Sequence, residues 1–312
     1  MKFSKNIKKL KGDASWRIFY RKKNKKKSSI IVFSKQNKRS NLLNYDSINK
    51  ILLRNKILAP TLLSKNYPKN FIEIEDFGNQ TIFNLFKKKE TNKFRVYIKI
   101  IHLLNKLQSI RQKKIVNFNN KVYEIPKYTS KILEKEAMLF SEWYIVNKLK
   151  RSEQKKFKKS YSEIIKKLIK KINQKNDTFV HRDFHISNLM LVKNKIGIID
   201  SQDALIGNKA YDLASLIDDV RFETSVKLKN RILNFYLKTQ KMLNQKTFKS
   251  DFRIISVLRN LKIIGIFTRL AVRDNKKKYL KLIPYTWSLI KLRSENNANF
   301  KDLNNLLKVL NN

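Results

Sequence analysis

At residues 181–188 the chain reads His181-Arg182-Asp183-Phe184-His185-Ile186-Ser187-Asn188, and a second acidic residue, Asp200, follows Asn188 after twelve positions. An acid, an amide five residues later and a second acid after an apolar run are typical of a site for phosphoryl transfer. One carboxylate can accept the proton of a hydroxyl group, and the amide and the other carboxylate can hold Mg²⁺ on nucleotide phosphates. The stretch predicts a kinase for a small hydroxylated molecule. Asp183 is the predicted catalytic base, and Asn188 and Asp200 are the predicted metal ligands.

Each of these residues alone would support a simpler interpretation. An isolated Asp in a loop is usually a turn residue or a helix cap, so the prediction depends on the combination of spacings and flanking strand-like segments. His181 and His185 lie four residues apart, but we expect a loop there, and His102 is the only other histidine. We therefore expect structural hydrogen bonds from both histidines, with a metal site or a single-histidine general base as the less favoured alternatives.

The bulk composition describes an ordinary globular protein. The chain has 312 residues, 42% of them hydrophobic, and no cysteine, which excludes disulfides, thiolate zinc sites and cysteine nucleophiles. Lysines and no apolar segment follow Met1, so we expect no secretory signal and a cytoplasmic location. The most apolar stretch, 254–272, is interrupted by Arg259, Lys262 and Arg269 and reads as a packed helix rather than a membrane span.

The formal net charge is +47, which leaves two interpretations open. Such a field attracts polyanions non-specifically and would suit a nucleic-acid-binding protein. The lysine runs at 22–27, 87–89, 155–159 and 276–278 are separate, however, and form no single stripe with interleaved aromatics. We favour compositional drift, because lysine, asparagine and isoleucine are all abundant and share A/U-rich codons. We expect a monomer with weak polyanion binding, no specific nucleic-acid partner and no membrane partner.

The pattern along the chain predicts an α+β protein with two lobes. Short aromatic and β-branched segments at 16–20 and 29–33 predict a hairpin, 42–58 a helix, and 71–75 a half-buried strand that breaks at Gly78. Helical spacing recurs at 94–111, 131–149, 161–172, 226–237 and 251–270, while strand-like pieces at 178–180, 188–192 and 196–199 surround the acidic cluster. We predict an N-terminal nucleotide-binding lobe over 1–76 and a mainly helical catalytic and substrate-binding lobe over 77–312.

Three further segments have a simple and a functional interpretation. The turn Gly12 to Ser15 could bring backbone N–H groups to phosphates, although no G-x-x-x-x-G-K-[ST] sequence occurs, which excludes the P-loop class. Asp212 reads first as a helix N-terminal residue and otherwise as a brace of the catalytic loop. Glu136 and Trp143 share a helical face, which suits core packing or the binding of a pyranose.

These motifs together resemble the aminoglycoside phosphotransferase and choline kinase superfamily. The resemblance is carried by His181 to Met190, Ile199 to Ala204 and Tyr211 to Leu216. It is closest to the bacterial anomeric kinases of N-acetylmuramate and N-acetylglucosamine, and it extends to 12–15, 75–78, 140–144, 259–262 and 265–270.

The resemblance implies a two-lobed protein-kinase-like fold that binds ATP or GTP with Mg²⁺. It implies that Asp183 is the base, and that Asn188 and Asp200 hold the metal. It implies nucleotide contacts at Asp13, Ala14, Ser15, Glu75 and Phe77, substrate contacts at Glu136, Trp143 and Asp203, and structural support from His181, His185 and Asp212. The implied acceptor is the anomeric hydroxyl of an amino sugar; aminoglycoside or choline-type acceptors stay open.

Two positions depart from the family pattern. The segment Ile30 to Phe33 contains no lysine for the nucleotide phosphates, and Lys35, on the same face by alternation, is the predicted substitute. Ser201 stands where an aromatic residue usually follows the metal-binding Asp, so we expect altered packing there. Both departures keep a slow kinase or a non-catalytic nucleotide-binding pseudokinase as alternatives.

Overall fold

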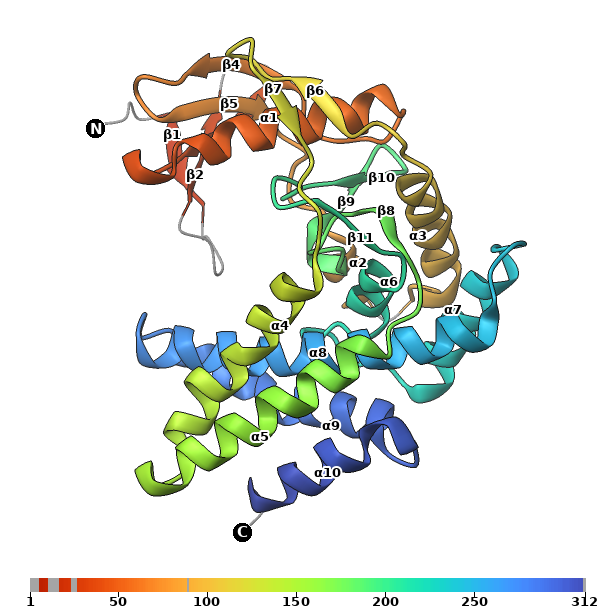
Figure 1. Ribbon diagram of the computed structural model, residues 1–312. Coiled ribbons are helices and arrows are strands. Elements are labelled where there is room, and N and C mark those ends of the chain that lie inside the picture. The colour runs from red at the N-terminus through yellow and green to blue at the C-terminus, as the bar shows by residue number, and fades with distance from the viewer. Residues whose placement is uncertain (1–5, 11–16, 24–26, 89, 311–312) are drawn as a thin grey trace. The chain divides into compact units, whose positions relative to one another are not determined.

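The computed structural model describes residues 6–10, 17–23, 27–88 and 90–310. The chain forms two compact units, and each of them uses two separate parts of the sequence (Figure 1). Unit 1 comprises Met1–Pro126 and Thr178–Ile206, and unit 2 comprises Lys127–Asp177 and Gly207–Asn312. The predicted division at residue 76, between a nucleotide-binding lobe and a substrate-binding lobe, stays a prediction.

In the described part of unit 1, an antiparallel sheet has the strand order β1-β2-β3-β5-β4. Its strands are β1 Ile7–Lys9, β2 Ile18–Lys23, β3 Ser28–Phe33, β4 Leu62–Asn66 and β5 Phe71–Glu75. The predicted hairpin is confirmed as β2 and β3, and the predicted strand at 71–75 is confirmed as β5. Helix α1, Ser40–Arg54, packs Leu42 and Tyr45 against Val32, Ile72 and Ile74 of the sheet. The alternation of apolar and acidic residues in β5 thus places its isoleucines toward α1.

The rest of unit 1 carries the predicted site. Its other elements are the helices α2 Ile82–Phe86 and α3 Lys93–Gln108, and the strand pairs β6 Lys114–Val116 with β7 Val122–Glu124 and β9 Leu189–Val192 with β10 Lys195–Ile198. Strands β8 Asn176–Val180 and β11 Leu205–Asn208 pair with each other where the chain passes between the units. The strand-like pieces expected around the acidic cluster are thereby confirmed as β8, β9 and β10.

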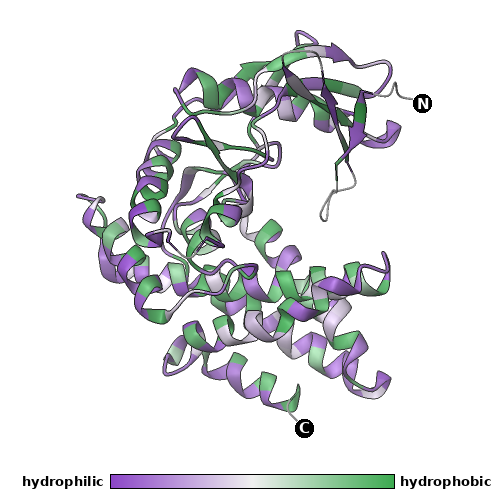
Figure 2. Ribbon diagram, turned by 180° about the vertical axis from the view of Figure 1, so that it is seen from behind, coloured by the Kyte–Doolittle hydropathy of each residue, from purple (hydrophilic) through white to green (hydrophobic). Residues whose placement is uncertain are grey.

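Unit 2 is helical. Its helices are α4 Ser130–Leu139, α5 Arg151–Lys170, α6 Ala210–Ile217, α7 Val226–Lys238, α8 Gln245–Val272, α9 Ile283–Ser294 and α10 Lys301–Leu307. Hydrophilic and hydrophobic residues alternate along these helices (Figure 2), so each can turn an apolar face inward. The core is built on α8, which packs against α4, α6 and α9. None of the described helices has the length and apolar content that crossing a lipid bilayer requires.

The segment 131–149 is helical, as its spacing predicts, but it is not one continuous α-helix. Helix α4 ends at Leu139, and a π-helical turn, Phe140–Tyr144, and a short 3₁₀ turn, Ile145–Asn147, follow. At this point α8 approaches so closely that a Cβ on Gly265 would overlap the backbone of Leu139 and Phe140. The extra residue in the π-turn therefore coincides with direct backbone contact between two helices, which local spacing does not reveal.

Candidate active site

Asp183 lies in a tight loop between β8 and a 3₁₀ turn, Ile186–Asn188. The loop begins with a left-handed residue, Arg182, at a φ of 80°. The backbone carbonyl of Asp183 accepts hydrogen bonds from the His185 amide and the Asn188 side-chain amide, both at 3.0 Å. These bonds fix the loop that follows Asp183, and the Asp183 side chain is half-buried.

The β9–β10 hairpin brings Asn188 next to Asp200. In this hairpin Leu189 pairs with Ile198, and the amide of Ile199 donates to the carbonyl of Asn188 at 3.0 Å. Asp200 then turns out of the extended conformation with a φ of 64°. The three residues predicted from the sequence, Asp183, Asn188 and Asp200, therefore converge within unit 1.

Negative charge is concentrated at Asp200. Burial raises the pKa of the Asp200 carboxyl, the Arg17 guanidinium lowers it, and the neighbouring Asp183 and Asp203 carboxylates raise it further, so that the net shift is upward. A carboxylate in such surroundings gains strongly from a bound cation. A bound cation beside Asp200 would therefore stabilise the charged form of this carboxylate.

The donors at this site fit Mg²⁺. Asn188 offers an amide oxygen, because its amide nitrogen donates to the Asp183 carbonyl, and Asp200 offers a carboxylate. Mg²⁺ prefers hard oxygen ligands and usually takes only one or two from a protein, with phosphates and water completing the octahedron. Within the described residues, no group of three or more His, Cys, Asp and Glu side chains is placed to hold a metal ion.

Arg17, which the sequence did not single out, occupies the centre of the acidic cluster. Its Nη2 donates to Asp200 Oδ1 at 2.9 Å and lies 4.0 Å from Asp203 Oδ2, and its Nη1 donates to Asn41 Oδ1 at 3.0 Å. Lys35, the predicted substitute for the strand lysine, is exposed in the segment after β3 and stays a prediction. The available signal for Arg17 was its sequence position, two residues after Ser15, the last of the predicted phosphate-contacting residues.

Ser201, which replaces the aromatic residue usual after the metal-binding Asp, makes a polar contact in the protein interior. Ser201 is fully buried, and its hydroxyl donates to Asn49 Oδ1 of α1 at 2.5 Å. Asn49 in turn donates to the Pro60 carbonyl at 2.9 Å. Burial raises the pKa of Tyr45, one turn earlier on α1, and the Asp200 carboxylate raises it further. Helix α1 therefore anchors the Asp200 loop.

Both histidines of the first motif are buried. Burial lowers the pKa of His181, although the Asp183 carboxylate opposes this shift, so His181 favours the neutral form. His185 Nε2 lies 3.4 Å from the Asn188 side-chain nitrogen. These positions agree with structural support, which stays a prediction for both residues.

The predicted nucleotide contacts are placed only in part. Asp13, Ala14 and Ser15 lie outside the described residues. Glu75 ends β5, and its carboxylate accepts from the Thr61 hydroxyl at 3.0 Å. Phe77 is buried against Gly197, where any Cβ would meet the Phe77 ring at 2.7 Å. Phe77 is thus packed on β10, the strand that leads to Asp200.

Glu136 and Trp143, which the resemblance implies as substrate contacts, do not have equivalent environments. Glu136 is buried and accepts hydrogen bonds from the Tyr128 hydroxyl and from Lys262 Nζ, the latter at 2.8 Å. Lys262 also donates to the Tyr211 hydroxyl at 3.2 Å. Trp143 is half-buried in the π-turn. The Glu136 charge is therefore already paired within unit 2.

Asp203 and Asp212 also differ in their surroundings. The Asp203 side chain is 41% exposed beside Asp200, and it accepts from Gln202 Nε2 at 2.7 Å. Burial and the Asp203 carboxylate together raise the pKa of Tyr123 to about 12. Asp212 is fully buried in the first turn of α6. Asp203 is thus open to a ligand, whereas Asp212 has the burial of a structural residue; both roles stay predictions.

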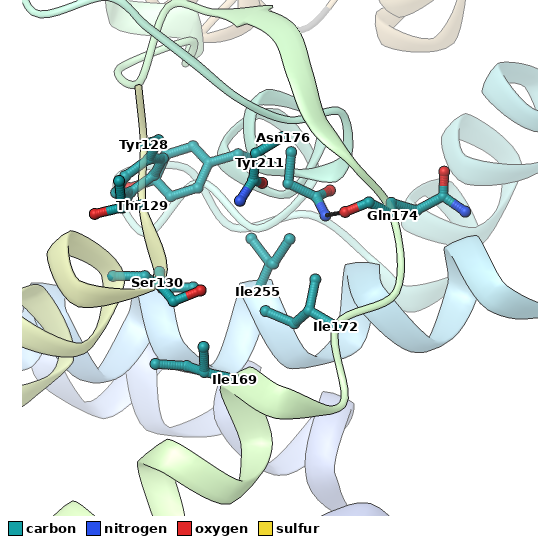
Figure 3. A pocket seen from close by; sticks show the side chains of 11 residues that line it. Tyr128, Thr129, Ser130, Ile169, Ile172, Gln174, Asn176, Tyr211 and Ile255 are labelled. Atoms are coloured by element: carbon teal, nitrogen blue, oxygen red, sulfur yellow. Dashed lines mark hydrogen bonds between the residues drawn. The ribbon is translucent and has the colours of Figure 1, made fainter. Parts of the chain in front are cut away.

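A separate pocket lies inside unit 2 (Figure 3). Aromatic and polar side chains from the start of α4, including Tyr128 and Thr129, face the apolar side chains of Ile169, Ile172 and Ile255. None of the residues that line this pocket is among the predicted catalytic, metal-binding, nucleotide-binding or substrate-binding residues. Two of its lining residues, Tyr128 and Tyr211, connect it to the Glu136–Lys262 pair.

The sequence is similar to those of known phosphotransferases and kinases. Residues 9–244 match the phosphotransferase enzyme family. The N-acetylmuramate/N-acetylglucosamine kinase of Neisseria meningitidis serogroup B is 26% identical over 306 residues, which cover 96% of this chain and 88% of that protein.

Solved structures of kinases are similar in fold. The ethanolamine kinase of Plasmodium vivax matches with a TM-score of 0.63 and 13% identity over 90% of this chain and 81% of its own. The ADP-bound aminoglycoside phosphotransferase APH(2'')-Ib matches with a TM-score of 0.61 and 13% identity over 92% and 93% of the two chains. These similarities confirm the predicted α+β, kinase-like fold.

Proposed function

Because this chain belongs to the phosphotransferase enzyme family, we propose that it moves the γ-phosphoryl group of ATP to the anomeric hydroxyl of N-acetylmuramate or N-acetylglucosamine. The observation that carries the phosphoryl-transfer chemistry is the convergence of Asp183, Asn188 and Asp200 through the hydrogen bonds of one loop and one hairpin. The choice of acceptor is supported by the similarity to the Neisseria kinase over nearly the whole chain.

In the proposed reaction the acceptor oxygen attacks the γ-phosphorus. A new O–P bond forms, the bond from the γ-phosphorus to the bridging oxygen breaks, and ADP leaves with the electron pair. The hydroxyl proton goes to the Asp183 carboxylate, which the loop holds in place. When bound, Mg²⁺ neutralises charge on the phosphate oxygens, and Asn188 and Asp200 are the residues that would hold it.

The charge of unit 2 supports an acceptor without positive charge. Helix α8 carries Arg259, Lys262 and Arg269, and the one buried acid of α4, Glu136, is paired with Lys262. A cationic aminoglycoside or choline would need unpaired carboxylates in its binding site. We therefore rank a neutral or anionic amino sugar above these acceptors.

An acceptor panel tests the proposal. The protein is mixed with Mg²⁺ and ATP, or GTP, and with N-acetylmuramate, N-acetylglucosamine, kanamycin or choline, and nucleoside diphosphate release is followed. We expect one of the two sugars to stimulate release and to yield the sugar 1-phosphate. Stimulation by kanamycin or choline alone would contradict the sugar assignment. Nucleotide binding without turnover for any acceptor would indicate a pseudokinase.

Substitution of the base tests the role of Asp183. We expect Asp183→Ala to reduce kcat at least about a hundredfold, because general base catalysis contributes about 10²–10⁴-fold, while the circular dichroism spectrum stays unchanged. The matched control is Asp177→Asn, an exposed carboxylate on β8, the strand that precedes the Asp183 loop, and this variant should keep full activity. Unchanged turnover of Asp183→Ala would remove Asp183 from the mechanism.

A further inference from the structure

The acidic cluster of unit 1 contains a buried guanidinium. Arg17 is 6% exposed, although most cations of so basic a chain lie in water. Burying a charge is unfavourable unless it is paired and hydrogen-bonded. Arg17 meets this condition through Asp200 at 2.9 Å and Asn41 at 3.0 Å. The fold therefore holds this one cation at the proposed metal site.

Strand β3 does not supply the lysine that many kinases place on a strand beside the nucleotide phosphates. Strand β3, Ser28–Phe33, contains no lysine, and the Lys35 side chain beyond its end is exposed. A transferred phosphoryl group nevertheless needs positive charge on the phosphate oxygens in addition to the metal ion. Arg17 is the cation that the described ion pairs place against Asp200.

We propose that Arg17 is the cation that binds a nucleotide phosphate in this protein. Before nucleotide binds, Arg17 is the counter-ion of Asp200. When nucleotide is bound, Arg17 also holds one of its phosphate oxygens. The inference rests on the proposed nucleotide site. A guanidinium presents five N–H donors in a planar fork, so it can serve a carboxylate and a phosphate at the same time.

Arg17 should affect the affinity for Mg²⁺ alone in the opposite direction from the affinity for Mg²⁺–ATP. With no nucleotide, the Arg17 charge opposes a second cation at Asp200 by Coulomb repulsion. Nucleotide phosphates bring negative charge that satisfies both Arg17 and Mg²⁺. Arg17 thus strengthens the binding of Mg²⁺–ATP and weakens the binding of Mg²⁺ alone, which favours the arrival of metal and nucleotide together.

Calorimetric titrations of the full chain test both signs. We expect Arg17→Gln to bind ATP in the presence of Mg²⁺ about 10–100-fold more weakly than the original chain, as for the loss of a charge-assisted hydrogen bond. The same variant should bind Mg²⁺ alone at least as tightly as the original chain. The matched control, Lys22→Gln, removes one positive charge from β2, the strand that directly follows Arg17, where Lys22 pairs with Glu73 at 3.2 Å. Its affinity for Mg²⁺–ATP should stay within about threefold of the original value.

Several outcomes would overturn the inference. A folded Arg17→Gln that binds Mg²⁺–ATP as tightly as the original chain removes the phosphate role. A variant that binds both Mg²⁺–ATP and Mg²⁺ alone more weakly shows that Arg17 only shapes the loop. If Arg17→Gln does not fold, Arg17→Lys decides: we expect several-fold weaker Mg²⁺–ATP binding, because an ammonium cannot bridge two anions as a fork does, and unchanged binding refutes the proposal. If the original chain binds neither ATP nor GTP, the proposed function fails as well.

Discussion

The hydrogen bond between Ser201 and Asn49 connects the Asp200 loop to helix α1, and both side chains are buried. Ser201→Ala leaves the Asn49 oxygen without this donor, so we expect the free energy of unfolding to fall by about 1–3 kcal/mol. Because Ser201 follows Asp200 directly, the affinity for Mg²⁺–ATP should fall too. Urea unfolding and calorimetric titration measure the two effects.

Ser47→Ala is the matched control for this prediction. Ser47 is also buried on α1, but its hydroxyl bonds only to the Leu43 carbonyl within the same helix. We expect a smaller loss of stability and no change in nucleotide affinity, because the Leu43 carbonyl belongs to the helical ladder. Equal nucleotide affinities in the two variants would show that the Asn49 contact does not position Asp200.

The site residues differ in how far the sequence reveals them. Asp183, Asn188 and Asp200 lie within one short stretch, so local strands and turns are sufficient to bring them together. Arg17 pairs with Asp200 across 183 positions of sequence. No periodicity or spacing records a contact of that range, which is why the sequence did not single out Arg17.

Helices α4 and α8 meet at Gly265, where a side chain would overlap the backbone of Leu139 and Phe140. Replacing a glycine inside a helix by alanine usually stabilises the helix by about 1 kcal/mol. Here we expect the opposite sign: Gly265→Ala should lower the free energy of unfolding by about 3 kcal/mol, because neither backbone can give way without disturbing the core. Urea denaturation of the variant measures the effect.

An alanine at an exposed position of α8 provides the comparison. Lys249→Ala should change stability by less than about 0.5 kcal/mol, since Lys249 is exposed near the start of the helix. If Gly265→Ala were as stable as Lys249→Ala, the two helices would not pack backbone to backbone.

Asp218 connects four helices of unit 2 from the end of α6. It accepts hydrogen bonds from Arg293 of α9 at 2.8 and 2.9 Å and from Ser256 of α8 at 2.6 Å, and it lies 3.5 Å from Lys229 of α7. Burial alone would raise the pKa of Asp218, but Arg293, Lys229 and Ser256 lower it below 3.8. Asp218→Asn should cost about 3–5 kcal/mol near neutral pH, because two buried cations lose their partner.

The same network predicts a pH dependence. The folded pKa of Asp218 is lowered, so its stabilisation is complete above the ordinary value of 3.8 and is lost as the pH falls through the folded value. The difference in unfolding free energy between the original chain and Asp218→Asn should therefore shrink below about pH 4. Urea titrations from pH 6 downward measure it, with Asp302→Asn, an exposed acid of α10, as the control. A constant difference at all pH values would contradict this assignment.

The elements that the sequence predicted well are those whose partners are near in the chain. Strand β5 and the β2–β3 hairpin follow from alternation and a polar turn, and α7 from its apolar spacing. The π-turn at Phe140–Tyr144 was not predictable in this way, because it coincides with the approach of Gly265 from a distant part of the sequence. Tertiary contacts of this kind leave no local pattern.

For the whole molecule, the formal charge of +47 predicts stabilisation by salt. Lysines such as Lys155, Lys156 and Lys159 of α5 are exposed, so they repel one another through solvent. Screening shortens the range of this repulsion from about 10 Å at 0.1 M salt to about 3 Å at 1 M. We expect the unfolding temperature to rise over this interval equally in NaCl and KCl. A decrease would indicate that screened attractive ion pairs outweigh the repulsion.

Both units are assembled from separated parts of the chain, since Thr178–Ile206 belongs with the first 126 residues and Lys127–Asp177 belongs elsewhere. During synthesis, the N-terminal sheet can form early, but the loop with Asp183 and Asp200 is added only after residue 206 has left the ribosome. By then the segment Lys127–Asp177 of unit 2 has emerged, but the rest of unit 2, Gly207–Asn312, has not yet been synthesised. A nascent chain that stalls before that point would expose the apolar faces of α4 and α5, which are buried against α8 in the folded protein.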